Sequence, residues 1–320
     1  MGAIVHRPGR DFGFGLLALA VLGLVAPWIG LYPVFVMKAL CFAMFACAFN
    51  LLLGFTGLLS FGHAAFFATA GYAAGHAIKV WGWPMEAGLG FAVLCSGLLG
   101  LAIGALAIRR QGIYFAMVTL ALAQMVFFVF LQAKFTGGED GLQGIPRGRL
   151  LGALDLADDL NLYYAVLAIF LACLALCYRI VHSPYGQVLK AIRENEPRAL
   201  SLGYRVDRYK LLAFVLSASL AGLAGGCKAL VVGFETLTDA AWQMSGEVVL
   251  MTLVGGVGTL FGPVIGAFAI VGLQDQLADR VGSWVQVILG LTFIVCVLGF
   301  RRGIAGEVAA WRERRRATSR

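Results

Sequence analysis

Seven apolar runs, each about 20 residues long, follow one another along this chain and constrain its fold more than any other feature. The runs cover residues 12–30, 34–53, 60–79, 88–108, 112–131, 162–181 and 211–232. A helix of this length spans the hydrocarbon core of a bilayer, whereas helices of soluble proteins carry a polar face. Apolar residues make up 60% of the chain and charged residues 13%, which suits lipid. The sequence therefore predicts an all-α polytopic membrane protein with a single transmembrane domain over residues 1–320.

Residues 245–279 are also apolar but are interrupted by glycine, and residues 284–300 form a plain final run. Cytoplasmic segments of membrane proteins carry an excess of Lys and Arg. If 245–279 crossed the membrane once, the basic tail 301–320 and the basic central segment 182–210 would lie on opposite sides. We therefore expect two short spans that meet at a glycine turn, and about ten spans in total. The two short spans are residues 245–258 and 262–279.

This topology places both termini and 18 of the 25 Lys and Arg residues in the cytoplasm. Arg7 and Arg10 precede the first run, which is too long for a signal peptide and lacks a cleavage site, so we expect an uncleaved first span. The longest extracytoplasmic segment is 132–161, and its sequence TGGEDGLQGIP is typical of tight turns. This segment either folds over the spans, docks an external partner or forms a lid.

No enzyme motif is present in the sequence, which lacks the phosphate-binding loop, His-Glu-x-x-His, Gly-x-Ser-x-Gly and Cys-x-x-Cys patterns. We expect no catalytic residues, no metal site and no cofactor, so any ATP must be hydrolysed by another chain. The formal charge of +8 does not indicate nucleic-acid binding, because the basic residues lie in short segments between spans. The seven cysteines are typical of small buried apolar residues.

Two irregular segments are expected to line a transport pathway, because non-helical backbone at membrane depth survives only inside protein or beside water. The first is residues 54–63 and the second is the glycine turn after residue 254. Residues 59–68 and 259–269 share a Phe-Gly start, so an internal repeat and a chance similarity are both open. A structural role for His63, the histidine of the first segment, is equally open. The candidate pathway residues are Thr56, Ser60, Gly62, His63, Gly255, Gly256 and Gly258.

Other polar residues within the apolar runs are expected to have structural roles. Near span ends, long side chains reach the membrane interface, which we expect for Lys38, Lys228, Glu247 and Asp275. Amides inside spans usually hydrogen-bond to neighbouring helices, which we expect for Asn50 and Gln124. A self-powered pump would be expected to have several acids or histidines in relay at mid-span, and this pattern is missing from the sequence.

The central segment 182–210 carries six basic residues and is expected to form two short helices. The first covers residues 186–195, with an apolar side and with Lys190, Arg193 and Glu194 facing away. The second runs from Pro197 in its first turn to Leu202, and Gly203 stops it. The pair is either a compact knob that binds a cytoplasmic partner or an interfacial segment attracted to anionic lipid.

Four blocks of sequence carry a resemblance to a known family. They are SPYGQVLKAIRENEPRALSLGY followed by KLLAFVLSASLAGLAGG, NLLLGFTGLLSFGHAAFFATAGY, TGGEDGLQGIP and LVGGVGTLFGPVIGA. Spread over about two thirds of the chain, they resemble the permease subunits of ABC importers for branched-chain amino acids, in the LivM-like branch of the LivH/LivM family. Permeases of this family for urea, amides, aromatic acids or sugars stay open as alternatives. A stand-alone secondary carrier, or a channel or scaffold, is the alternative outside it.

The resemblance implies one membrane-spanning half of an importer in a bacterial inner membrane. Its implied partners are a second homologous permease subunit, two cytoplasmic ABC ATPase subunits and a periplasmic or other extracytoplasmic solute-binding protein. Gln187 and Pro197 depart from the family pattern, so the second short helix is expected to be kinked or shifted. The residues that match the family's ATPase-coupling segment are Gly186, Ala191, Ile192, Arg193, Glu194, Asn195, Glu196 and Gly203.

Overall fold

The computed structural model describes residues 8–30, 32–150, 154–284, 287–292, 294, 303–304 and 306. The longer helices are α1 (Pro8–Val25), α2 (Pro33–Thr56), α3 (His63–Lys79), α4 (Met85–Ala107), α5 (Ile113–Gln132), α6 (Asp159–His182), α9 (Val206–Val232), α11 (Trp242–Gly255) and α12 (Gly262–Val281). The shorter ones are η1 (Ala26–Ile29), η2 (Lys134–Thr136), η3 (Gly138–Asp140), α7 (Pro184–Glu194), α8 (Glu196–Ser201), α10 (Leu237–Ala240) and η4 (Gly282–Trp284). A small antiparallel hairpin, β1 (Arg149–Leu150) and β2 (Leu154–Asp155), pairs Arg149 with Asp155 and Leu150 with Leu154. The expected all-α membrane fold is confirmed.

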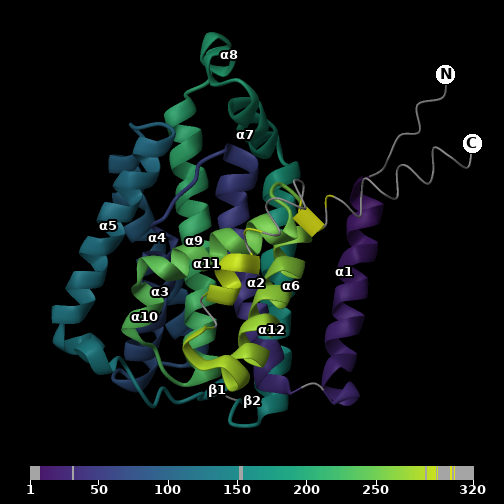
Figure 1. Ribbon diagram of the computed structural model, residues 1–320, viewed down its shortest axis with the longest axis vertical. Coiled ribbons are helices and arrows are strands. Elements are labelled where there is room, and N and C mark those ends of the chain that lie inside the picture. Colours follow the sequence, from purple (N-terminus) through teal and green to yellow (C-terminus); the bar gives the residue numbers. More distant parts are fainter. Residues whose placement is uncertain are drawn as a thin grey trace, which may run out of the picture.

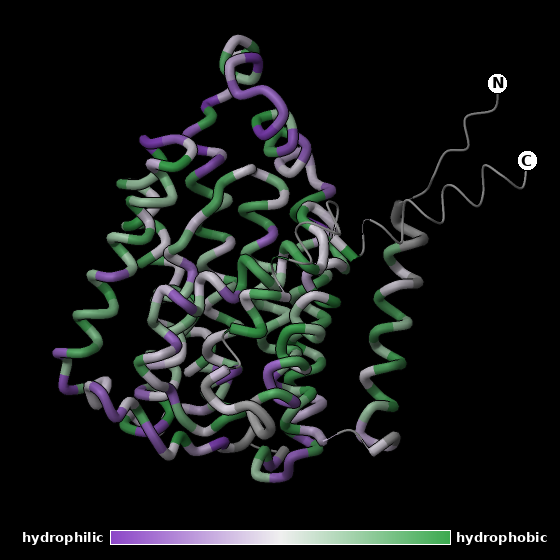
Figure 2. Tube along the Cα trace, in the orientation of Figure 1, coloured by the Kyte–Doolittle hydropathy of each residue, from purple (hydrophilic) through white to green (hydrophobic). Residues whose placement is uncertain are grey.

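The bundle has two polar ends joined by apolar helices. Helices α7 and α8 project from one end, and the hairpin β1–β2 lies at the opposite end (Figure 1). Figure 2 shows hydrophilic residues gathered toward these two ends and hydrophobic residues along the helices between them. Within the residues that the structure describes, five helices, α2, α4, α5, α6 and α9, are long and apolar enough to cross a membrane. The bundle axis is therefore the direction in which the chain crosses the bilayer.

Helix α2 forms the centre of the bundle and packs against α6, α9, α11 and α12. In its most apolar 18-residue window, 89% of the residues are buried, compared with 28% in the corresponding window of α5. The outer helices α4, α5 and α6 instead expose leucine and phenylalanine, for example Leu98, Leu106, Phe128 and Leu176. In lipid such exposure costs little, so α2 is held by packing with its neighbours and not by escape from water.

Glycine allows the helices to approach one another closely. A Cβ atom at Gly100 would lie 2.5 Å from the Cβ of Ala218 in α9, and one at Gly104 would meet Phe214 of the same helix. Gly266 of α12 packs directly against the backbone of α11, as close spacing of small residues predicts. Gly71 is different, because it faces the carboxylate of Glu235 in a connecting segment and not a helix.

Within the described residues, the expected spans correspond to the observed helices with one difference. The glycine-interrupted segment does form two helices, α11 and α12, that meet at a glycine turn. However, the 14 residues of α11 rise only about 21 Å, less than the roughly 30 Å of a hydrocarbon core, so α11 does not cross the membrane alone. The expected final span, 284–300, and the basic tail, 301–320, lie mostly outside the described residues.

Candidate functional site

Helices α7 and α8, which together form the α7–α8 knob, begin and end at capping residues. Ser183 caps α7 by accepting a hydrogen bond from the Gly186 backbone N–H at 3.2 Å. Asn195 ends α7 and caps α8, its Oδ1 accepting from the Arg198 N–H at 3.0 Å. Pro197 lies in the first turn of α8, where a missing N–H has no cost, so this departure from the family pattern does not disrupt the helix. The expected pair of short helices is confirmed.

The inner face of the knob is packed onto the bundle. Ile192 of α7 and Ala199 of α8 are buried together with Val206 at the start of α9. The ring of Tyr185 stacks on that of Tyr209 at 5.6 Å, and its hydroxyl donates to the Tyr209 carbonyl at 2.9 Å. Burial, followed by the neighbouring Tyr209, raises the pKa of the Tyr185 phenol, which keeps it protonated as a donor.

Glu196 connects α8 to two other parts of the bundle. Its Oε1 lies 2.7 Å from the ammonium nitrogen of Lys210 in α9, whose side chain is almost fully buried. The same oxygen accepts a hydrogen bond at 3.1 Å from Gln111, in the turn between α4 and α5. Because Lys210 is shielded from water, its ion pair with Glu196 limits rotation of α8 on the bundle.

Arg193 connects α7 to α2, contrary to the expectation that it faces away. Its Nη1 donates to the Gly54 carbonyl in the last turn of α2. The Lys190 ammonium also turns back, lying 5.8 Å from the centre of the Phe55 ring. The charged ends of both side chains reach back to α2 because α7 lies across its end, which periodicity within one helix does not reveal, and the rest of Arg193 is exposed. Glu194 is exposed as expected.

The outer face of the knob combines apolar and polar exposed groups. The side chains of Leu200 and Leu202 are 55% and 69% exposed, although they lie at a polar end of the bundle. Of the eight matched coupling residues, Gly186 and Ile192 are buried and Glu196 is partly buried. The remaining five are exposed: Ala191, Arg193, Glu194, Asn195 and Gly203.

The glycine turn between α11 and α12 lies directly against α2. Asn50 of α2 holds the turn in both directions, since its Oδ1 accepts from the Gly258 N–H at 2.9 Å and its Nδ2 donates to the Thr259 carbonyl at 2.8 Å. Gly54 lies one helical turn further along, and a Cβ there would lie 2.7 Å from the Gly258 nitrogen. The expectation that Asn50 forms structural hydrogen bonds is confirmed, and its partner is a backbone turn.

The irregular segment between α2 and α3 is also tied to its neighbours. Thr56 donates to the Leu52 carbonyl, and Ser60 accepts from the Gly62 N–H at 3.2 Å. The Phe61 N–H donates to the hydroxyl of Thr119 in α5 at 3.2 Å. These contacts satisfy backbone groups that lipid could not satisfy.

His63 is enclosed within this subunit. Its Nε2 lies 2.8 Å from the hydroxyl of Ser217, and its ring contacts the aromatic rings of Phe49, Phe66 and Phe214. It is fully buried, and its Nδ1 has no hydrogen-bond partner among the described residues. The neighbouring Ala64 N–H donates to Ser245 of α11 at 2.9 Å, which ties the start of α3 to the start of α11. Lining of a pathway by these residues stays a prediction.

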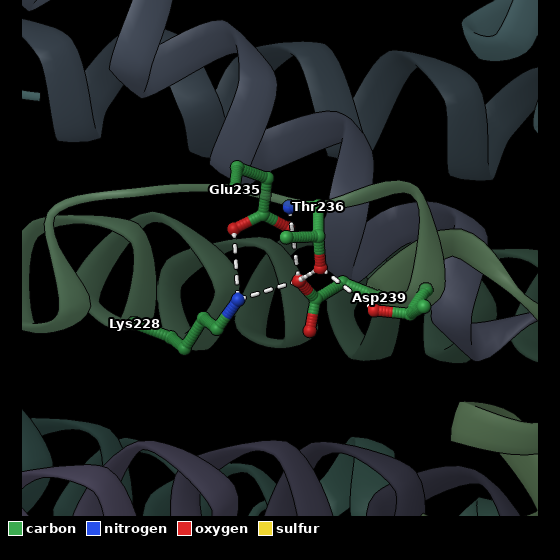
Figure 3. A network of polar contacts seen from close by, with 5 residues as sticks. Lys228, Glu235, Thr236 and Asp239 are labelled. Atoms are coloured by element: carbon green, nitrogen blue, oxygen red, sulfur yellow. Dashed lines mark hydrogen bonds and ion pairs between the residues drawn. The ribbon is translucent and has the colours of Figure 1, made fainter. Parts of the chain in front are cut away.

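A buried ion cluster joins α9 to α10 (Leu237–Ala240) and to the segment between them (Figure 3). The Lys228 ammonium lies 2.5 Å from Asp239 Oδ2 and 3.3 Å from Glu235 Oε2, and all three residues are buried. Asp239 also accepts from the backbone and hydroxyl of Thr236. The prediction that the Lys228 side chain reaches the membrane interface is therefore wrong, because Glu235 and Asp239 fold back over it. Sequence reasoning missed Glu235 and Asp239, and their spacing of seven and 11 residues from Lys228 was the available signal.

Glu235 has the more unusual environment of the two acids. Its Oε1 is buried and has no hydrogen-bond partner, and the carboxylate lies against Gly71. Lys228 lies closer to Asp239, so it compensates Glu235 less. Burial, with a smaller contribution from Asp239, raises the pKa of Glu235 well above its ordinary value despite the opposing effect of Lys228.

The segment 132–161 covers the end of the bundle opposite the α7–α8 knob (Figure 1). Leu142 and Glu235 exchange two backbone hydrogen bonds of 2.9 Å, and the Ile145 N–H donates to the Gly233 carbonyl at 2.8 Å. Arg147 pairs with Asp159 at 2.5 Å, which ties the segment to the start of α6. The interpretation that 132–161 folds over the spans agrees with these contacts.

The cysteines and acids offer no metal site within the part of the chain that the structure describes. No group of three or more His, Cys, Asp or Glu residues there is arranged to hold a metal ion. The described cysteines are free, and all except Cys95 are buried. Their burial agrees with the interpretation of cysteine as a small apolar residue.

Comparison with known proteins adds independent evidence. The sequence model of the family described as "Branched-chain amino acid transport system / permease component" matches residues 34–297. The high-affinity branched-chain amino acid transport system permease protein LivM of Salmonella typhimurium is 26% identical over 90% of this chain and 74% of its own length. LivM of Escherichia coli is 27% identical, over 80% of this chain and 65% of its own. The autoinducer 2 import system permease protein LsrC of Klebsiella pneumoniae is 30% identical, over 57% and 56%. No solved structure matches.

Proposed function

Because the chain belongs to the family of branched-chain amino acid transport system permease components, we propose that it forms one membrane-spanning half of an ATP-driven importer. It is a multi-pass membrane transporter subunit and not an enzyme. Its solutes are branched-chain or related apolar amino acids, as the names of the LivM relatives suggest. The chain lacks a phosphate-binding loop, so partner subunits hydrolyse the ATP.

The observation that carries this proposal is the two-sided character of the α7–α8 knob. Its inner face is held on the bundle by Arg193, Glu196 and the Tyr185 ring, whereas its outer face exposes Leu200 and Leu202 among charged residues. An apolar face with a charged rim, outside the membrane, fits a groove on a protein partner. An ATPase subunit occupies this face, and the second permease subunit presents a corresponding knob to a second ATPase.

The knob then acts as the lever of the transport cycle. ATP-dependent closure of the two ATPases draws the knobs together, and the fixed inner face passes this movement to the helices. The cycle requires two bundle arrangements that contact the ATPases differently. Glu194 is exposed on α7 where an ATPase would make those contacts, beside Arg193, whose guanidinium is held on α2.

The α7–α8 end faces the cytoplasm in this assignment. Helix α1 begins at that same end (Figure 1), so in this assignment its first described residues lie on the cytoplasmic side. The opposite end, with segment 132–161 and the hairpin, faces an extracytoplasmic solute-binding protein. A residue near 145 should then be labelled by a membrane-impermeant thiol reagent from outside, and a residue near 200 should not. Labelling of both positions from outside would overturn the orientation.

The pathway lies along the two irregular segments beside α2. Its candidates remain Thr56, Ser60, Gly62, His63, Gly255, Gly256 and Gly258, and the contact of Ala64 with Ser245, which joins the start of α3 to the start of α11, supports a pathway that uses both segments. Movement of α11 and α12 against α2 and α3 would open these residues to the solute. Burial of all of them except the partly exposed Gly258 fits an occluded arrangement.

A second solute class is favoured by one comparison. The LsrC relative is named for import of autoinducer 2, and its identity of 30% is higher than that of the LivM relatives over a shorter length. A permease of this chain's family for a sugar-like solute is therefore the alternative.

Co-purification and reconstitution test the proposal. The chain is purified with its associated subunits, reconstituted in proteoliposomes and supplied with solute-binding proteins loaded with leucine, isoleucine, valine or a sugar. We expect ATP hydrolysis and uptake to be stimulated by an apolar amino acid. Uptake that proceeds without ATPase subunits would instead indicate a stand-alone carrier.

A further inference from the structure

The side chain of Asn50 occupies a position between the knob and the glycine turn that is not explained by helix packing alone. It is 2% exposed in the centre of the bundle, where an amide must find hydrogen-bond partners. Both of its partners are backbone groups of the turn, at 2.8 and 2.9 Å, more than 200 residues away in sequence. The amide therefore fixes the turn to α2 and not one helix to another.

The same turn of α2 receives the knob. Arg193 of α7 donates to the Gly54 carbonyl, one helical turn beyond Asn50. A Cβ at Gly258 would lie 3.3 Å from the Arg193 guanidinium and 3.3 Å from the Gly54 oxygen. Arg193, Gly54 and Gly258 are thus in mutual contact, so a displacement of α7 acts on α2 and on the turn together.

The turn is stiff enough to pass such a displacement on. The Thr259 hydroxyl donates to the Gly256 carbonyl at 2.7 Å and accepts from the Gly262 N–H at 3.1 Å, which joins the end of α11 to the start of α12. At Gly266 the two helices are in backbone contact. At its other end, α11 holds the start of α3 through Ser245.

We propose that Asn50 is the positioning residue that transmits movement of the α7–α8 knob to the glycine turn and hence to α11 and α12. The contacts run from Arg193 to Gly54, through Asn50 to the turn, and through α11 to the segment that begins α3. This inference rests on the proposed function, because it assumes that an ATPase moves the knob. A contiguous set of contacts becomes a transmission route only if its members are energetically coupled.

Transport stoichiometry in the reconstituted complex tests the role of Asn50. Asn50→Ala removes both hydrogen bonds to the turn, and Asn50→Asp keeps the acceptor for Gly258 while losing the donor to Thr259. We expect solute transported per ATP to fall about tenfold in Asn50→Ala and by less in Asn50→Asp, with ATP hydrolysis retained. Thr69→Ala is the matched control, because Thr69 hydrogen-bonds within its own helix α3.

A double variant separates transmission from local structure. If Arg193 and Asn50 act in series, Arg193→Ala with Asn50→Ala has the stoichiometry of the more impaired single variant, whereas independent effects multiply. A merely structural defect lowers hydrolysis and uptake equally and leaves their ratio unchanged. An unchanged ratio in both Asn50 variants, or multiplying effects, would overturn the inference. Failure of the proposed function is distinguishable, since the unmodified complex would then show no ATP-driven uptake.

Discussion

The two polar clusters of the bundle are built on opposite principles. Near the knob, the junction of Asn50 and Arg193 with Gly54, Gly258 and Thr259 uses side chains to hold backbone, across 139 to 209 residues of sequence. Toward the other end, the ion cluster joins charged side chains to one another within 11 residues. The first connects distant elements, and the second closes the connection between α9 and α11.

This difference indicates which cluster is suited to movement. Hydrogen bonds from an amide to a turn have modest net strength, and a shift of the helices that they join separates no charges. Two buried carboxylates around one ammonium cannot be separated without exposing an uncompensated charge to a low-dielectric region. We therefore expect the junction to change during transport and the ion cluster to stay intact as a fixed anchor.

Loss of the lysine should have the largest effect. Lys228→Met leaves Glu235 and Asp239 buried without a cation, and we expect the free energy of unfolding to fall by about 3–5 kcal/mol. Thermal unfolding in detergent measures this. Lys134→Met, at an exposed position of the covering segment, is the matched control and should have little effect.

Neutralising Glu235 and Asp239 together with Lys228 tests more sharply whether charge makes the ion cluster a fixed anchor. Lys228→Met combined with Glu235→Gln and Asp239→Asn removes all three charges, and we expect it to recover part of the lost stability. A triple variant no more stable than Lys228→Met would mean that shape, and not charge, holds this region together.

Stability should also depend on pH through Glu235. Its pKa is raised in the folded state, so the folded protein binds the proton more tightly than the unfolded chain does. The contribution of Glu235 to stability is therefore greatest near the ordinary glutamate pKa of about 4.3 and falls as pH rises toward the folded pKa, by at most about 1.4 kcal/mol per pH unit. Unfolding of the protein and of Glu235→Gln between pH 4 and pH 8 checks this. The variant should lose this part of the pH dependence, and an unchanged profile would contradict the environment assigned to Glu235.

Much of the fold follows from the sequence, whereas the two clusters do not. Apolar runs of membrane length locate the long helices, and Ser183, Asn195 and Pro197 act locally, so the caps of α7 and α8 are readable in sequence order. Arg193 turns inward because α2 ends beneath α7, which is a tertiary fact. Lys228 is buried because the segment that follows α9 folds back over it. The expectation that a lysine near a span end reaches the membrane interface takes no account of that segment.

A smaller effect should follow from adding a methyl group to the junction. Gly258 has a φ of +78°, and Gly30 has a φ of +86°, so alanine is strained at both positions by about 1 kcal/mol. Of the two, Gly258 also lies against Arg193 and Gly54, whereas a Cβ at Gly30 would enter open space. Gly258→Ala should therefore lower solute transported per ATP more than Gly30→Ala does. Equal ratios in the two variants would mean that the junction tolerates displacement without loss of coupling.

The contact of Glu196 with Lys210 should give the smallest effect. Like the ion cluster, it is a pair of opposite charges, but it lies at the knob. Glu196 is partly exposed there, so water screens the pair. A double-mutant cycle of Glu196→Gln and Lys210→Met should give a coupling free energy of about 1 kcal/mol or less. Gln111→Ala, which removes the other partner of Glu196, is the control and should change stability by less. A coupling energy as large as that of Lys228 would place a second rigid anchor at the knob, and the contrast between a movable end and a fixed end would then fail.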